Sequence, residues 1–418
     1  MRRIVILGGG TAGTIMANRL HRALEPTRWE IVVIDGEPTH YYQPGFLFLP
    51  FGMYSRDDVV RPKLGFMPRG MKVVFTTAEA IEPADNRIHM ADGSIIEYDY
   101  LIIATGSQVH PEETEGLHGE EWGHSIHEFY TLDGALALGE LLGRWTGGRL
   151  VLNIAEMPIK CPVAPIEFLF LADWWFTRRG MREKVELELV TPLPGAFTRP
   201  MCSTVLGHMF DDKHIKLTTD FALAEVDGTA KQIKDWEGRS VPYDLLVSVP
   251  TNMGDAVIGR SGLGDDLNFV PTNPQTLQAK GYENIYVLGD ATDLPSSKAG
   301  SVAHFQSEIL TENLLCAMRG APPAASFDGH TNCFIESGYG KAILVDFNYD
   351  TEPLPGKFPV PRLGPFTLLA ESRINHWGKL GFRWIYWNLL IKGRSLLIPP
   401  RMSMAGKLPP PALKKREA

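Results

Sequence analysis

The chain is poor in cysteine and has no long hydrophobic run. Its 418 residues include four cysteines, too few for a disulfide scaffold, and no Cys-x-x-Cys pair of the kind found in zinc ribbons and thioredoxin-like proteins. No apolar run approaches the ~20 residues that a membrane-spanning helix needs, which excludes a polytopic membrane protein. The run at residues 4–7 is too short for the core of a signal peptide, so we expect none and place the protein on the cytoplasmic side.

Positive charge is scarce over most of the chain. The net charge is −8, yet the segment after position 370 holds ten Lys and Arg residues against two acids. A nucleic-acid-binding protein would carry a basic stripe on its main domain, so we exclude nucleic acid as a partner. The basic end favours contact with an anionic membrane surface instead.

A glycine-rich turn follows the first apolar run. Residues 3–7 are typical of a β-strand, residues 8–13 read Gly-Gly-Gly-Thr-Ala-Gly, and apolar residues then recur at helical spacing. A second apolar run ends at Asp35, 22 residues after Gly13. This order is the dinucleotide-binding fingerprint, in which glycines let the backbone approach a pyrophosphate and the acid binds a ribose. The predicted cofactor-binding residues of this segment are Gly8, Gly10, Thr11, Ala12, Gly13 and Asp35.

Two later segments indicate which dinucleotide is bound. Residues 101–107 form an apolar strand that ends in small residues, and residues 285–290 form another that ends in Gly-Asp, before a predicted helix over 301–318. Together with the fingerprint, they resemble the flavoproteins with two dinucleotide-binding domains, which implies FAD as the cofactor. The resemblance assigns Asp290 to the ribityl chain and the start of the helix to the flavin, where its dipole favours negative charge. The FAD-binding residues that it implies are Gln43, Ala104, Thr105, Gly106, Gly289, Asp290 and Ala303.

Lys298 lies just before that helix. It either sits near the isoalloxazine or a quinone, or it is an ordinary solvated lysine of a loop. The sequence leaves both interpretations open.

The second nucleotide site, which such flavoproteins use for NAD(P)H, lacks its glycines. Residues 150–154 form a good strand, but residues 155–165 contain three prolines and no glycine. Proline has no backbone N–H to give to a phosphate, so we expect no NAD(P)H site. The loop presents Cys161 beside Lys160, whose charge can lower the thiol pKa. A buried, inert cysteine is the alternative.

The two segments around Cys161 and Cys333 carry a more specific resemblance. Residues 160–165, Lys-Cys-Pro-Val-Ala-Pro, are similar to the KC-x-x-AP segment of sulfide:quinone oxidoreductases and of the related flavocytochrome c sulfide dehydrogenases. Residues 333–349, which begin Cys-Phe-Ile-Glu-Ser-Gly-Tyr, are similar to the second cysteine segment of that group. The likeness runs in the same order from residue 4 to about residue 393.

This resemblance implies a reaction. Cys161 and Cys333 would form a disulfide over the flavin, sulfide would open it, and two electrons would pass through FAD to a membrane quinone. Which cysteine carries the sulfane sulfur stays open. Glu167 is a candidate proton acceptor. Equally, it is an acid that stabilises the first turn of a helix. Cys316 reads as a core thiol, and Cys202 matches no cysteine of the resemblance.

We therefore expect an α/β fold with two Rossmann-like domains, the second of them degenerate. The FAD-binding domain would comprise residues 1–108 and 275–330. The degenerate domain, residues 109–274, would carry Cys161. A C-terminal quinone and membrane region, residues 331–418, would carry Cys333.

The C-terminal segment suggests where the quinone is met. Residues 373–392 are aromatic, aliphatic and basic, and contain no acid. Such a segment is typical of a short helix that lies in the membrane interface without crossing the bilayer. The alternative is a helix packed into the protein or a partner subunit, which leaves a homo-oligomer open. We expect residues 408–418 to be a disordered basic tail.

Three other functions compete with this one. A type II NADH:quinone dehydrogenase needs the glycine fingerprint that residues 153–160 lack. A soluble sulfide dehydrogenase subunit that reduces a cytochrome would be favoured by an export signal. A flavin-dependent redox sensor would not turn over with sulfide.

Overall fold

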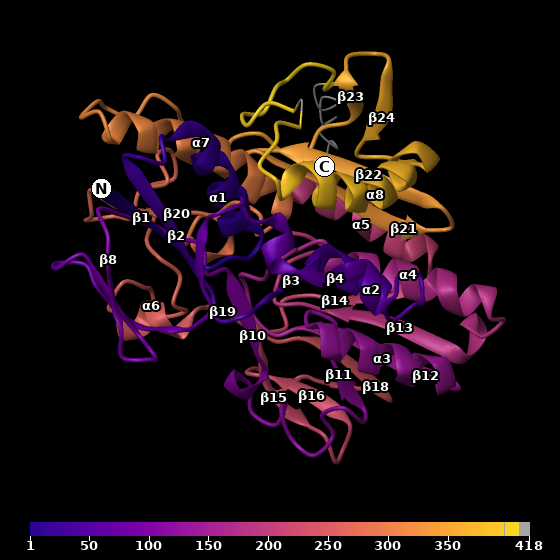
Figure 1. The fold of residues 1–418 in the computed structure, drawn as a ribbon. Helices are drawn as coiled ribbons and strands as arrows, with labels where there is room; N and C mark the ends of the chain where they lie inside the picture. The colour runs from indigo at the N-terminus through magenta and orange to yellow at the C-terminus, as the bar shows by residue number, and fades with distance from the viewer. Residues whose placement is uncertain (397, 409–418) are drawn as a thin grey trace.

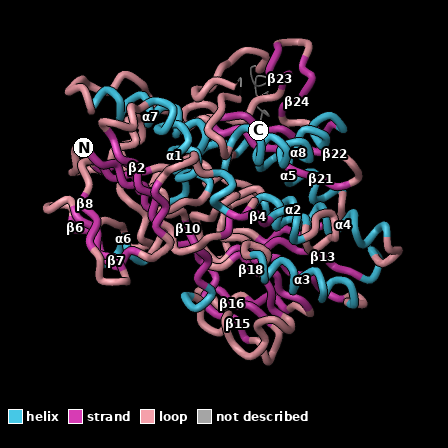
Figure 2. The backbone as a smooth tube through the Cα atoms, viewed as in Figure 1, coloured by secondary structure: helices cyan, strands magenta, loops and turns pink. Residues whose placement is uncertain are grey.

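The computed structural model describes residues 1–396 and 398–408. Two parallel sheets with flanking helices form the body, and a third sheet lies beside them with the C-terminal helix (Figure 1). Loops and turns connect most of these elements (Figure 2), in keeping with 41 glycines and 31 prolines. The predicted tail lies outside the described residues, apart from Leu408.

The first sheet is built around the strand that precedes the glycine turn. Its strands are all parallel because each connection crosses over a face of the sheet. Apolar side chains cover both faces, so the strands read as continuous hydrophobic runs. The strand order is β20 (Ile285–Val287), β9 (Tyr100–Ile103), β1 (Arg2–Leu7), β2 (Trp29–Ile34) and β5 (Lys72–Val74). Helices α1 (Thr11–Ala23) and α7 (Gly300–Ala317) pack side by side on this sheet (Figure 1).

The second sheet repeats this plan with different residues. Its parallel strands follow the order β11 (Ile126–His127), β18 (Leu245–Val249), β12 (Gly148–Ile154), β13 (Val185–Val190) and β14 (Ile215–Thr218). Its helices are α3 (Leu132–Arg144), α4 (Ala164–Arg178) and α5 (Pro200–Asp212). The loop of residues 155–163 separates β12 from α4, whereas only residues 8–10 separate β1 from α1. These two parallel sheets confirm the predicted α/β fold.

The third sheet is largely antiparallel and carries the second cysteine segment. Its members are β21 (Thr331–Gly338), β22 (Lys341–Phe347), β23 (Gly356–Val360), β24 (Gly364–Leu368) and β25 (Glu371–Ser372). Helix α8 (Arg373–Ile385) packs on β21 and β22 (Figure 1) and continues into a π-turn, Tyr386–Leu390. One edge of β21 has no strand partner within residues 1–396 and 398–408, and it faces α4.

The remaining elements are short. The small antiparallel pairs and sheets are β3 (Thr39–Tyr41) with β4 (Val60–Pro62), β6 (Ala78–Glu82) with β7 (Arg87–Met90) and β8 (Ile95–Glu97), β10 (Ser107–His110) with β19 (Thr251–Gly254), and β15 (Leu223–Asp227) with β16 (Gln232–Asp235) and β17 (Ser240–Pro242). The short helices are α2 (Arg56–Val59) and α6 (Ala256–Arg260). Among the described residues, we find no helix that has both the length and the apolar character needed to cross a membrane.

Candidate active site

One cavity of about 450 Å³ collects most of the predicted site residues. It lies where the carboxyl ends of the first sheet meet the loop before α4, β21 and α8. Open α/β sheets bind their ligands at such strand ends. The predicted residues that line it are Gly10, Thr11, Ala12, Gln43, Ala104, Thr105, Gly106, Cys161, Glu167, Gly289, Asp290, Lys298, Ala303 and Cys333. Gly8, Gly13 and Asp35 lie behind this lining.

The glycine turn is shaped by close backbone approach. Gly8 has φ +97°, and a Cβ there would come 2.4 Å from the Ala104 carbonyl oxygen. A Cβ on Gly13 would come 1.8 Å from the Gly8 carbonyl oxygen. Only glycine fits at either position. These contacts let α1 begin close to the end of β1 and point its N-terminus into the cavity.

Asp35 secures the turn from outside. Its carboxylate accepts the backbone N–H groups of Gly9 and Glu37 and pairs with Lys63 Nζ at 2.6 Å. The Lys63 side chain is buried. The role predicted for Asp35 on a ribose stays a prediction, and the sequence pattern did not mark Lys63 as its partner.

The cavity fits an FAD molecule on the evidence of its own groups. Helix α1 begins with no side-chain cap and no acid in its first turn, so its N–H groups stay open to a pyrophosphate. The backbone is also open at Gly10 and Gly106, where a Cβ would meet nothing within 4 Å. Thr105 Oγ1 is buried without a hydrogen-bond partner among the described residues, as expected of a group that a ligand completes. Helix α7 likewise starts at Gly300 with no cap and no acid.

The loop before α4 holds Cys161 in a strained conformation. Cys161 has φ +49°, a region that residues other than glycine enter at a cost of about 1–3 kcal/mol. Its N–H donates to the Lys298 carbonyl oxygen at 2.8 Å, and its own carbonyl accepts the N–H of Ala164 at 2.9 Å. These bonds fix the cysteine at the start of α4, beside the helix that begins after Lys298.

Both cavity thiols are free and half-buried in this structure. Burial raises the pKa of Cys161 to about 12 and that of Cys333 to about 11. The Cys161 pKa therefore lies above its ordinary value, not below it as the neighbouring Lys160 suggested. Lys160 Nζ points to the Ser107 carbonyl oxygen at 3.4 Å, and Lys379 is the cation that counteracts the effect of burial on both thiols.

Lys379 is the main site residue that the sequence pattern missed. It comes from α8, and its ammonium lies 2.7 Å from Glu167 Oε1 and donates to the Phe334 carbonyl oxygen at 3.0 Å. Burial raises the pKa of Glu167, which Lys379 opposes, while the Glu167 carboxylate helps to raise the pKa of Lys379. The only local signal was a lysine within an aromatic and aliphatic stretch.

Glu167 belongs to the first turn of α4, as its alternative interpretation requires, but it also lines the cavity. Its Oε1 atom accepts the N–H of Glu336 at 2.7 Å, at the free edge of β21. Its Oε2 atom is buried and has no partner among the described residues. The carboxylate therefore links the two cysteine segments and keeps one oxygen available.

Lys298 is not a solvated loop lysine. It is buried, it donates from Nζ to the carbonyl oxygens of Asp290 at 2.8 Å and Thr292 at 2.7 Å, and it lies 3.8 Å from the centre of the Phe269 ring. Burial lowers its pKa to about 8. Burial also raises the pKa of Asp290, which the charges of Lys298 and Lys160 oppose. The floor of the cavity thus holds two lysines around one acid.

The other two cysteines lie outside this cavity. Cys202 is buried in α5 and Cys316 is buried in α7. Burial raises the pKa of Cys202 to about 12 and the charge of Glu352 adds to this shift, whereas Lys379 opposes the effect of burial at both cavity thiols.

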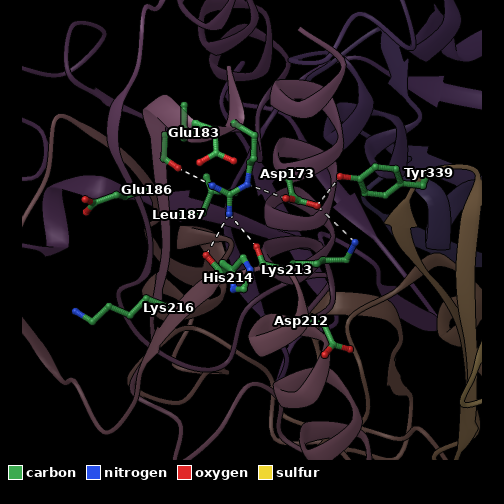
Figure 3. A pocket seen from close by; sticks show the side chains of 11 residues that line it. Asp173, Glu183, Glu186, Leu187, Asp212, Lys213, His214, Lys216 and Tyr339 are labelled. Carbon is green, nitrogen blue, oxygen red and sulfur yellow. Dashed lines mark hydrogen bonds and ion pairs between the residues drawn. The ribbon is translucent and has the colours of Figure 1, made fainter. Parts of the chain in front are cut away.

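A second hollow, of about 610 Å³, lies at the far end of α4 (Figure 3). Asp173 accepts hydrogen bonds there from Arg182 Nε at 2.8 Å and from the Tyr339 hydroxyl at 3.0 Å. Tyr339 lies in the turn after β21, and a Cβ on Gly338 would come 2.8 Å from Trp174 Cβ. No cysteine lines this hollow. Its contacts dock the hairpin of Cys333 on the helix that follows Cys161.

The C-terminal segment divides into two parts. Trp377 and Trp384 of α8 are 75% and 61% exposed, as expected of a membrane-facing helix. Tyr386 and Trp387 are buried instead, as the alternative of a helix packed into the protein predicts. The Tyr386 hydroxyl bonds to Thr11 Oγ1 at 2.6 Å and His40 Nε2 at 2.8 Å, so this end of the segment closes the glycine turn.

Comparisons with known proteins agree with this arrangement. Residues 2–146 match the pyridine nucleotide-disulphide oxidoreductase family. The chain is 30% identical to the mitochondrial sulfide:quinone oxidoreductase of Dictyostelium discoideum over 398 residues, 94% of this chain and 86% of that one, and 27% identical to that of Mus musculus, over 93% and 86%. The X-ray structure of the sulfide:quinone oxidoreductase from Aquifex aeolicus shares the fold, with a TM-score of 0.79 and 20% identity over 94% of this chain and 92% of that one. These matches confirm the predicted fold, its FAD cofactor and an oxidoreductase, and they show that the chain belongs to the sulfide:quinone oxidoreductase family.

Proposed function

We propose that the chain oxidises sulfide to zero-valent sulfur and passes the electrons through Cys161, Cys333 and FAD to a membrane quinone. One observation carries the proposal. Two cysteines that are 172 positions apart in the sequence line a single cavity together with the glycine turn and Asp290. Thiols in that place can exchange electrons with a bound flavin.

The sulfur chemistry balances on these two side chains. In the oxidised state Cys161 and Cys333 form a disulfide, and HS⁻ attacks one sulfur, which leaves a persulfide on one cysteine and a thiolate on the other. When the disulfide closes again, one zero-valent sulfur and one proton depart and two electrons are released. FAD supplies the two-electron acceptor. A further nucleophile carries the sulfur away, and the order of the two cysteines is left to experiment.

The surrounding charges suit the thiolate that this exchange releases. Burial disfavours a thiolate at both cysteines, and the Lys379 ammonium compensates. Glu167 holds that ammonium in place and offers its free oxygen as a proton acceptor. The carboxylate and the lysine therefore act as a pair rather than as separate groups.

The cofactor assignment follows the elements that face the cavity. Residues 1–108 and 275–330 would hold FAD, with the pyrophosphate at α1, Asp35 on the ribose and Asp290 on the ribityl chain. Gln43, Thr105 and Ala303 would lie along the ring system. Residues 109–274 would provide the cysteine loop, and residues from 331 on would provide the second cysteine and the quinone end.

The quinone would enter beside α8. Phe382, Ile385 and Leu389 line the cavity from the same segment whose Trp377 and Trp384 face solvent. Exposed tryptophans with neighbouring Arg and Lys residues favour the headgroup layer of an anionic membrane. We therefore propose peripheral attachment through α8, on the cytoplasmic face. Vesicle flotation tests it, because Trp377→Ser/Trp384→Ser should release the protein from anionic vesicles while sulfide still bleaches its flavin.

Anaerobic mixing with sulfide tests the main proposal. Wild type should bleach its flavin and reduce a short-chain quinone, whereas Cys161→Ser and Cys333→Ser should each lose at least about a hundredfold in turnover. Cys202→Ala, outside the cavity, is the matched control and should keep its rate. Normal turnover in both serine variants would contradict the redox role of the cysteines.

The alternatives meet specific obstacles. An NADH dehydrogenase would need phosphate-binding N–H groups where the loop places prolines, and Glu167 puts a negative charge in the first turn of α4. Electron transfer to a soluble cytochrome would leave the aromatic face of α8 without a role.

A further inference from the structure

The proposed reaction consumes a proton in the cavity. Its balance is HS⁻ + H⁺ + quinone → S⁰ + quinol, so one proton per turnover must come from solvent. Glu167 and Lys379 line this cavity, and their side chains are only 1% and 12% exposed. They can hand a proton to a substrate but need a connection to the outside.

A second acid lies directly behind this pair. Glu336 on β21 donates its backbone N–H to Glu167 Oε1 at 2.7 Å. Its own carboxylate is 1% exposed and pairs with His376 Nδ1 at 2.8 Å. Glu336 therefore contacts the Glu167 carboxylate through its backbone N–H and the His376 imidazole through its side chain.

The residues Lys379, Glu167, Glu336 and His376 form a connected series, and His376 is its member nearest the surface. Its side chain is 16% exposed, so the ring meets solvent while its Nδ1 faces the buried acid. It stands three residues before Lys379 on α8, and both face β21 because residues three apart share one side of a helix. An imidazole can accept a proton at one nitrogen and release one from the other.

Other titratable groups surround His376 and Glu336. Glu167 on α4 and Lys379 on α8 are two of them, and Tyr54 is a third. Burial raises the pKa of the Tyr54 hydroxyl, the charges of Arg383 and Lys379 oppose this shift, and those of Asp58 and Glu336 add to it. The Arg383 and Asp58 side chains pair with each other. Burial raises the pKa of Glu167, and the charge of Glu336 adds to this shift.

We propose that His376 and Glu336 form the proton inlet that resupplies the Glu167–Lys379 pair during quinone reduction. The inference rests on the proposed function. His376 takes a proton from water at Nε2 and gives its Nδ1 proton to the Glu336 carboxylate. That proton then moves to Glu167, and from the Glu167–Lys379 pair to a quinone oxygen as the two electrons arrive. No other redox partner is needed.

The two halves of the reaction separate this role from a structural one. In stopped-flow experiments on the FAD-loaded protein, His376→Gln and Glu336→Gln should bleach with sulfide within about twofold of wild type. Their reoxidation by decylubiquinone should be slower by about a hundredfold, the scale of general acid catalysis. The double variant should be no slower than either single one, because both remove the same route. Imidazole in the buffer should restore part of the rate of His376→Gln.

Two controls sharpen the experiment. His208→Gln, on the exposed face of α5, should leave both halves unchanged. Calorimetry should give the same decylubiquinone affinity for wild type and Glu336→Gln, a substitution that keeps the shape of the side chain. Equal slowing of both halves, additive effects in the double variant, or unchanged reoxidation would overturn the inlet. A wild type that sulfide fails to bleach would contradict the proposed function itself and the inlet with it.

Discussion

The loops after β1 and after β12 occupy equivalent places in two sheets of the same plan. Each follows the central strand of five parallel strands and leads into a helix. The first is a short glycine turn whose helix starts without an acid. The second is longer, carries prolines and Cys161, and leads into a helix with Glu167 in its first turn. A Rossmann-like framework thus supports either an anion site or a thiol site, depending on about ten residues at one strand end.

The largest contrast that we expect is between electron donors. NADH should bleach the flavin at least about a thousandfold more slowly than sulfide, a barrier difference of about 4 kcal/mol. The second loop offers prolines and a carboxylate where NADH phosphates would need N–H groups. Anaerobic spectra with each donor measure the ratio. Comparable rates would mean that the second sheet still binds a nucleotide.

The glycine turn should tolerate no side chain at Gly13. Gly13→Val should lower the FAD content of the purified protein more than about tenfold, because its Cβ would collide with the Gly8 backbone. Pro162→Ala, in the other loop, is the matched control and should keep its FAD. Flavin absorbance per protein measures both. Equal FAD loss in the two variants would contradict the claim that the glycine turn binds FAD and the cysteine loop does not.

Loss of Lys379 should slow the reaction with sulfide at the thiol loop and leave FAD binding at the glycine turn unchanged. Lys379→Met should slow bleaching by sulfide by about tenfold to a hundredfold, because it removes the ammonium that stabilises a thiolate at either cysteine. Since the ammonium lowers the pKa of both thiols against the effect of burial, its loss should move the rise of the rate with pH toward alkaline pH. Rates from pH 6 to 10 would show it. An unshifted profile with normal FAD content would contradict this role.

The smallest effect should separate cofactor contact from folding at the glycine turn. Gly10→Ala should leave the melting temperature of the FAD-free protein almost unchanged, because its Cβ would meet nothing within 4 Å. FAD affinity should nevertheless fall by about tenfold, or about 1.4 kcal/mol, because the new methyl group faces the cavity. Titration of the FAD-free protein measures it. Unchanged affinity would place the pyrophosphate elsewhere.

Sequence patterns predicted the parts of the site that depend on local backbone. The glycine turn, the small residues after β9 and the Gly-Asp after β20 each sit within a few residues of a strand end, and all reach the cavity. Predicted helix limits were also close, 301–318 against Gly300–Ala317. The predicted lowering of the Cys161 pKa failed because burial outweighs a neighbouring charge, and the Lys160 side chain turns to the Ser107 carbonyl oxygen.

The strand ends, the glycine turn and the proline-containing cysteine loop follow from the sequence, because steric limits on short segments decide where a backbone can turn or approach a phosphate. Tertiary structure alone decided which charges are buried together. Lys379 meets Glu167 across more than two hundred residues of chain, Glu336 meets His376, and Tyr386 turns inward while Trp384 stays exposed. Such pairings arise when distant elements pack, since burial makes an unpaired charge costly and so brings partners from far along the chain.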